Sequence, residues 1–341
     1  MKSTIDRKKI RELLKPYEIK NNNLAIKLFL IDYFLFFIGQ YGVIKLPLIL
    51  KPFSSLLILV SIARLFILGH DACHGSFTNS KKLNKILGWF AFFPALTLFK
   101  SWAIGHNSTH HGYTNFLGRI DSWQPLCPSA YQSLDKFQKI LYRIYRSPLG
   151  GWVYYMKEWW RYLYFPSAKV IGAEAAKKLF IDFVCVNLFF AIWISILSFF
   201  AVVTNQAVYL LLFFGFLLPF IAWNMVMGLI VYLHHTHPKV KWYENREEWF
   251  AALTNLTATV HVRFPQWIST GIHHIMEHPA HHLNQNIPCY NLKAAQNKLE
   301  EEIPAETIVI QDFSWKWYLE CTRVCKLYDF ENHEWVGFPE N

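Results

Sequence analysis

Five of the chain's fifteen histidines fall within twelve residues, in the stretch GIHHIMEHPAHH at 271–282. Three further histidine clusters have short, regular spacings: HDACH at 70–74, HNSTHH at 106–111 and HHTH at 234–237. Neutral imidazole binds iron, copper and zinc. Residues three or four apart lie on one face of a helix, so each cluster can direct several ring nitrogens at one point. The clusters together therefore predict a metal centre bound by histidines.

The spacings single out particular histidines within the clusters. The motif HxxxH contains His70 and His74, HxxxHH contains His106, His110 and His111, and HxxHH contains His278, His281 and His282. On an α-helix His111 lies about 140° round the axis from His106, so it is expected to reach a second, adjacent metal. The first pair and the last trio are each expected to face one centre. Eight or nine imidazoles exceed the four ligands of a structural zinc, which favours two ions with five or six ligands each.

The cluster at 234–237 offers a ninth ligand. His234 and His235 differ by about 100° on a helix, so they cannot both face the metals. Pro238 disfavours helical geometry at His237, which leaves the direction of His237 open. Any one of the three therefore stays a candidate on geometry alone.

Long apolar runs account for the low charged fraction of the chain. Only 17% of the residues are charged, against about 25% in a typical soluble domain. A helix of about 20 apolar residues crosses a bilayer. Segments of this kind lie at about 24–44, 52–69, 179–203 and 207–233. The expected fold is an all-α integral membrane protein with four transmembrane helices and one domain over residues 1–341.

The distribution of basic residues predicts how these spans are oriented. Seven Lys or Arg lie in the first twenty residues, whereas the links at 45–51 and 204–206 contain only Lys45 and Lys51. By the positive-inside rule both termini and the central segment 70–178 are cytosolic. The spans then form two hairpins below a cytosolic, histidine-rich helical cap, in a bacterial inner membrane or the endoplasmic reticulum.

A fifth apolar segment, at 83–99, is interrupted by Pro94. If this segment crossed the membrane, the cluster at 106–111 would be separated from the other three. We therefore expect it to be re-entrant or interfacial. Asp32 and Arg64 should lie at similar depth below the cytosolic surface, and an unpaired charge at that depth is costly. This favours an ion pair between them, although Arg64 reaching toward the headgroups and Asp32 facing water is the alternative.

The net charge of +10 and the six cysteines do not indicate any further binding or redox site. The basic residues flank apolar segments and no nucleic-acid motif accompanies them, so no nucleic-acid partner is expected. No CxxC pair is present, which argues against a zinc ribbon or a thioredoxin-type site.

The stretches GHDACHGSF, GHNSTHHGYTNFLGRIDSWQP, LHHTHPKVKWYE and HHIMEHPAHHLNQNIPCYNL resemble the membrane fatty acid desaturases, in particular acyl-lipid desaturases of the Δ12 type. The resemblance covers roughly residues 65–295. It implies two non-haem irons, with O2 as co-substrate, that introduce a cis double bond into a lipid-linked acyl chain. An external ferredoxin or cytochrome b5 would supply the electrons. The ligands it implies, with no further catalytic residue, are His70, His74, His106, His110, His111, His235, His278, His281 and His282.

Other functions are also compatible with the sequence. A hydroxylase or ketolase would use the same di-iron scaffold, and histidine spacing does not distinguish these outcomes. A membrane metal transporter or sensor is a reading from another class, but transport sites lie near the bilayer midplane and these clusters lie at span ends. Trp102 and Trp123 are candidates for tunnel walls or for ordinary core packing. Asp121 is a candidate for orienting a ligand imidazole, or an exposed loop residue.

Overall fold

The apolar segments form long helices in the computed structural model, which describes residues 7–118, 123–165 and 173–339. Four helical segments in these residues are long and apolar enough to cross a membrane: Asn22–Lys45, Leu48–His74, Leu179–Val203 and Val208–His235. Their bounds agree closely with the predicted spans. The second is longer than predicted because the helix continues through the first histidine cluster and ends only at Gly75, whose φ of 73° suits a helix C-terminus.

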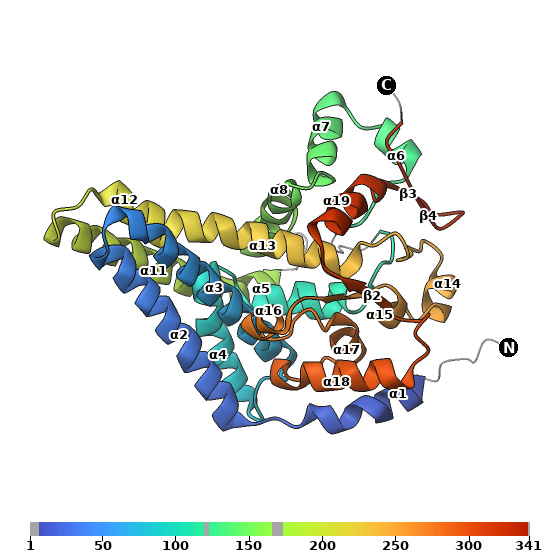
Figure 1. Ribbon diagram of the computed structural model, residues 1–341, viewed down its shortest axis with the longest axis horizontal. Helices are drawn as coiled ribbons and strands as arrows, with labels where there is room; N and C mark the ends of the chain where they lie inside the picture. Colours follow the sequence, from blue (N-terminus) through green and yellow to red (C-terminus); the bar gives the residue numbers. More distant parts are fainter. Residues whose placement is uncertain (1–6, 119–122, 166–172, 340–341) are drawn as a thin grey trace.

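These segments lie together on one side of the molecule, at the left of Figure 1. Helix α2 packs along α3, and α11 packs against α12. Many large apolar side chains on the outer faces of these helices are exposed, for example Phe34 at 64% and Phe199 at 62%. Exposed apolar area of this extent is typical of helices in contact with lipid. The elements are α2 (Asn22–Lys45), α3 (Lys51–His74), α11 (Ala173–Val203), α12 (Val208–Leu212), a π-helical segment (Phe213–Leu217) and α13 (Leu218–His235).

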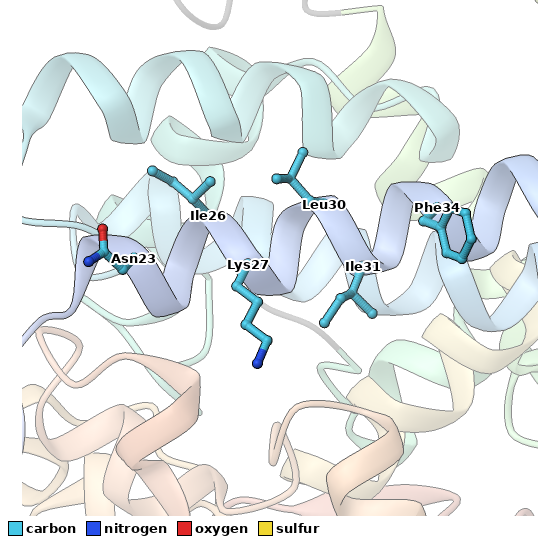
Figure 2. Close-up of a pocket in the computed structure, with 6 residues that line it drawn as sticks. All are labelled: Asn23, Ile26, Lys27, Leu30, Ile31 and Phe34. Atoms are coloured by element: carbon cyan, nitrogen blue, oxygen red, sulfur yellow. The ribbon is translucent and has the colours of Figure 1, made fainter.

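The N-terminal half of α2 has a shallow apolar groove on its surface, of about 450 Å³. Figure 2 shows Leu30, Ile31 and Phe34 along it, with Lys27 nearer the start of the helix. None of the clustered histidines lines this groove. It belongs to the exposed apolar face of a candidate span.

The remaining helices surround the ends of the spans. Before the third span these are α1 (Arg7–Leu14), α4 (Lys81–Phe92), α5 (Phe99–Ala103), a π-helical segment (Ile104–His110), α6 (Pro128–Gln132), α7 (Lys136–Tyr145), α8 (Gly151–Tyr154), a π-helical segment (Tyr155–Trp160) and α9 (Arg161–Tyr164). After the last span come α14 (Arg246–Ala251), α15 (Thr254–Thr257), α16 (Gln266–Gly271), α17 (His278–Leu283), α18 (Cys289–Glu302) and α19 (Trp315–Val324).

The described chain is mostly helical, as predicted, but it also contains four short strands that the sequence did not indicate. Strand β1 (Val260–Arg263) pairs in parallel with β2 (Val309–Asp312), with Val260 opposite Val309. Strand β3 (Leu327–Asp329) pairs antiparallel with β4 (Glu334–Val336). Runs of three or four residues are too short to give a periodicity that sequence analysis can recognise.

The interrupted segment at 83–99 is sharply bent. Helix α4 ends near Pro94, Leu96 adopts a left-handed conformation with a φ of 47°, and the chain resumes as α5. The two helical pieces, Lys81–Ala95 and Phe99–His110, meet at 103°. A proline that cannot continue the helix, followed by a left-handed residue, accounts for the break.

The predicted ion pair between α2 and α3 is confirmed. The Arg64 Nε atom lies 2.5 Å from Asp32 Oδ1, and the Asp32 side chain is fully buried. The second carboxylate oxygen accepts a hydrogen bond of 2.6 Å from His273 Nε2, which the sequence did not predict. Arg64 also donates to the carbonyl oxygen of Gly271. Asp32 and Arg64 thus tie the first two spans to the segment that leads into α17.

Candidate metal centre

Nine buried or half-buried histidines meet where the spans end. Their ring nitrogens form two groups, and within each group the candidate ligand atoms lie within 4.8 Å of one another. One group contains His70, His74, His106, His111 and His281, and the other contains His110, His235, His278 and His282. These nine are the residues that the resemblance implied. No carboxylate belongs to either group.

The histidine clusters lie at the ends of helices or on a short helical segment. His70 and His74 lie in the last two turns of α3, and His235 is the last residue of α13. His278 begins α17, with Pro279 in its first turn. Helix ends converge because the spans pack side by side, so segments far apart in the sequence bring their imidazoles to one place.

The second cluster departs from the α-helical prediction. It lies on a π-helix, Ile104–His110, in which each backbone N–H bonds the carbonyl five residues earlier; His111 N donates to His106 O at 3.1 Å. His106 and His111 therefore face the same group, and His110 faces the other. The expectation that His111 reaches a different metal from His106 is wrong, because it assumed α-helical periodicity.

The third cluster is also divided between the two groups. His278 and His282, four residues apart, belong together, whereas His281 belongs to the group that contains His70. The expectation of one shared centre for this trio is therefore wrong. His281 and His282 are adjacent on α17 and point in directions about 100° apart, so the helix serves both groups.

The spacing of the ring nitrogens fits metal ligands. Metal–nitrogen bonds of about 2.0–2.1 Å place neighbouring ligands about 2.9 Å apart in square-based or octahedral geometry, and about 3.4 Å apart in a tetrahedron. The Nε2 atoms of His70 and His106 are 2.8 Å apart, and those of His278 and His235 are 2.9 Å apart. The remaining close Nε2 pairs lie at 3.0–3.2 Å. Separations of 2.8–3.2 Å are compatible with ring nitrogens that bind a common ion.

The environment keeps these imidazoles in the form that binds metal. Burial, together with neighbouring imidazoles, lowers the pKa of His278, His281 and His282 well below the usual value for histidine. Burial also lowers the pKa of His111 well below the usual value. Neutral imidazole has a free lone pair, which a metal ion requires. His74 Nε2 is buried and has no hydrogen-bond partner among the described residues, as expected of a metal ligand.

Three outer ring nitrogens are held by residues that sequence reasoning did not identify. His70 Nδ1 lies 3.2 Å from Asp71 Oδ1, and the other Asp71 oxygen accepts the Cys289 N–H at 2.6 Å. His282 Nδ1 lies 3.2 Å from the Thr114 hydroxyl. His235 Nδ1 lies 3.2 Å from the backbone carbonyl oxygen of Ala258. Such contacts fix the ring orientation and leave Nε2 directed inward. Asp71 and Thr114 each lie within three residues of a clustered histidine, and that proximity was the only signal for them.

The cluster at 234–237 contributes one member to the groups, His235. The His234 ring instead stacks on the His278 ring, with centroids 3.6 Å apart. His237 accepts a hydrogen bond from the Lys239 N–H and lies near Trp317. The 100° offset between neighbouring helical residues accounts for the choice between His234 and His235.

The other histidines near the clusters have different partners. His273 is bound to Asp32, and His274 Nδ1 lies 3.1 Å from Glu277. Both adopt left-handed backbone conformations, with φ of 48° and 58°, in the turn between α16 and α17. Neither belongs to a metal group. Asp121 lies outside the described residues.

An apolar cavity of about 50 Å³ adjoins one side of the histidine groups. Trp102, Trp223 and Met227 line it, and Trp102 also packs in a core cluster, so its position is compatible with both interpretations. Trp123 instead packs in the core. The histidines that face this cavity are His70, His106, His110, His234, His235 and His278.

A second, larger cavity of about 860 Å³ reaches the groups from another side. It is lined by His74, His111 and His282, none of which faces the apolar cavity. Its other lining residues come mainly from α1, α14 and the segments next to the histidine clusters, and many are polar. The histidine groups therefore separate an apolar compartment from a polar one.

Comparison with known proteins agrees with this arrangement. The family model for fatty acid desaturase matches residues 47–314. The sn-1 oleoyl-lipid 12-desaturase of Picosynechococcus sp. is 30% identical over 280 residues, which is 81% of this chain and 76% of that protein. The sn-1 oleoyl-lipid 12-desaturase of Synechocystis sp. is 28% identical over 86% of this chain and 81% of its own length.

A plant relative shows the same likeness. The chloroplastic omega-6 fatty acid desaturase of Arabidopsis thaliana is 28% identical over 91% of this chain and 66% of that protein. The family model covers well over half of the chain, and the matched region contains both histidine groups. The chain belongs to the fatty acid desaturase family, whose members are oxidoreductases.

Proposed function

We propose that this protein introduces a cis double bond into a lipid-linked acyl chain at a pair of non-haem irons. The observation that carries the proposal is the set of nine imidazoles, in groups of five and four, beside an apolar cavity. The nine proposed ligands are the members of those two groups. The relatives named oleoyl-lipid 12-desaturases support an acyl-lipid substrate.

Iron with O2 supplies the oxidant that an unactivated C–H bond requires. In the overall reaction one –CH2–CH2– unit, O2, two electrons and two protons give one –CH=CH– unit and two molecules of water. The imidazoles, in their neutral form, hold the ions. Asp71 and Thr114 fix the orientation of the His70 and His282 rings. Trp102, Trp159 and Trp223 line the compartment beside them and exclude water from the reacting methylenes.

We also propose the membrane arrangement that the sequence favours. The four spans form two hairpins with both termini and the histidine groups on the cytosolic side, and the bent segment at 83–99 is re-entrant. The sharp 103° bend and the single meeting point of all four clusters support this topology. A single desaturase domain over residues 1–341 and an external ferredoxin or cytochrome b5 as electron donor complete the proposal.

Expression in a host of known lipid composition tests the reaction. The expected result is a new cis-unsaturated fatty acid in the membrane lipids, absent in a His281→Ala variant. A His261→Ala variant is the matched control, because His261 pairs with Glu300 and belongs to neither group. Hydroxylated or keto products would assign the protein to the oxygenases on the same scaffold. An unchanged lipid profile with iron bound would refute the proposed reaction.

A further inference from the structure

The polar cavity opens between helices on the side of the molecule opposite the candidate spans (Figure 1). Helices α1 and α14 border it, and both lie at the right of Figure 1, opposite the side where the spans extend. At its inner end are His74, His111 and His282, which are proposed ligands from both groups. This cavity is thus a direct route from the aqueous side to the metal centre.

The lining of this cavity is positively charged. Arg7, Arg11 and Arg246 line it, whereas no Asp or Glu is among the described residues that do so. Glu247 and Glu248 follow Arg246 on α14 but do not line the cavity; Glu248 Oε2 lies 3.5 Å from His333 Nε2. All three arginines are exposed, so their charge acts on whatever approaches the opening.

A short bonded path connects the opening with a proposed ligand. Trp249, a half-buried residue of α14 that lines the cavity, donates from Nε1 to the Thr114 carbonyl oxygen at 2.8 Å. The Thr114 hydroxyl lies 3.2 Å from His282 Nδ1. Phe250, the exposed neighbour of Trp249, has the Arg7 guanidinium 4.1 Å from its ring centroid. An aromatic surface therefore lies two hydrogen bonds from the metal centre.

We propose that this opening is where a small acidic one-electron carrier docks, and that Trp249 and Thr114 form the route by which electrons enter at His282. The inference rests on the proposed function, since desaturation consumes two electrons per double bond. Each docking delivers one electron from the reduced carrier, which leaves oxidised, so two dockings serve one turnover. The protons that accompany them can enter through the same polar cavity.

A lipid headgroup is the other anionic partner that arginines would attract. Its position in the bilayer argues against it here, because the opening lies on the side of the molecule away from the spans. The acyl chain already has an apolar compartment on the opposite side of the histidines. Charge complementarity to arginines with an aromatic patch between them fits an acidic protein surface, since such pairs steer association.

Binding of a plant-type [2Fe–2S] ferredoxin to the protein in nanodiscs tests the docking surface without any need for turnover. In an Arg11→Glu/Arg246→Glu variant we expect the dissociation constant to rise at least tenfold. Wild-type binding should weaken as salt is added. An Arg323→Glu variant, altered at an exposed arginine of α19, is the matched control and should bind as the wild type does. Cytochrome c, a basic carrier, should not bind.

The electron path has its own test. A Trp249→Phe variant should bind ferredoxin normally but oxidise reduced ferredoxin at least tenfold more slowly, whereas a Trp315→Phe control should match the wild type. With photoreduced riboflavin, a small donor that needs no docking surface, the Arg11→Glu/Arg246→Glu variant should form product at the wild-type rate.

The outcomes separate the two proposals. Equal ferredoxin affinity in the wild type and the charge-reversed variant, or no binding to the wild type, would overturn the docking surface. Tighter binding of anionic vesicles to the opening in place of ferredoxin would also overturn it. Selective loss of ferredoxin binding without any double bond in any assay would support the docking surface and refute the desaturase.

Discussion

Replacing Asp32 with Asn should destabilise the protein through the charge left on Arg64. Asn keeps the size of the side chain and an oxygen that accepts the His273 hydrogen bond, but its NH2 group then faces Arg64, so the change removes the negative charge and the Arg64 hydrogen bond together. Removing one partner of a buried ion pair costs about 3–5 kcal/mol. Arg64 is 14% exposed and keeps its bond to the Gly271 carbonyl, which places the expected cost near the lower end, about 3 kcal/mol. At about 2 °C per kcal/mol for a large domain, the melting temperature should fall by about 6 °C.

A double-mutant cycle measures whether the two residues are coupled. The variants are Asp32→Asn, Arg64→Leu and the double variant, with unfolding followed by intrinsic fluorescence in nanodiscs. If the pair stabilises the fold, the double variant should be more stable than the sum of the single effects by about 2 kcal/mol. Arg263 and Asp312 form an exposed pair and serve as the control cycle, for which about 0–1 kcal/mol is expected.

Two results would refute this reasoning. Additive single effects would mean that the contact contributes no coupling. A drop of less than about 1 °C for Asp32→Asn would mean that Arg64 reaches water or headgroups at little cost.

The other predictions concern the centre and its surroundings. Protein from iron-supplied cells should contain about two irons per chain, with nitrogen-rich scattering in X-ray absorption; one zinc that survives iron loading would contradict this. His235→Ala should lose iron and product together, whereas His237→Ala and His234→Ala should keep their iron; full iron in His235→Ala would disprove its role as ligand. Met227→Trp should fill the apolar cavity and reduce product at least tenfold with iron unchanged, and unimpaired product would place the acyl chain elsewhere. Gly228→Leu should lower stability by about 1–3 kcal/mol in thermal unfolding, because a Cβ there would lie 2.3 Å from the Gly151 carbonyl oxygen of α8; an unchanged melting temperature would show that α8 moves freely.

Much of the membrane architecture could be predicted from the sequence. Helices that cross a bilayer need long apolar runs, and such runs are visible in composition alone. The same reasoning gave the ion pair, since both Asp32 and Arg64 lie at a known number of residues from a span end, and the helical rise converts that number to a depth. The histidine clusters were evident because their spacing is local.

The division of the histidines between two groups was decided by the tertiary structure. The sequence offered nine candidate ligands but placed His111 and His106 at different metals, because the π-helix at Ile104–His110 has no signature that periodicity detects. His235 was favoured over His234 by resemblance, yet only the end of α13 against α17 shows which ring faces the group. Asp71 and Thr114 contact His70 and His282 because their side chains point toward those rings, and the direction of a side chain cannot be read from the residue type. The separation of an apolar from a polar cavity depends on helices that are distant in the sequence. Local periodicity and composition therefore determined which residues and spans this protein uses, and packing between distant segments decided where each one points.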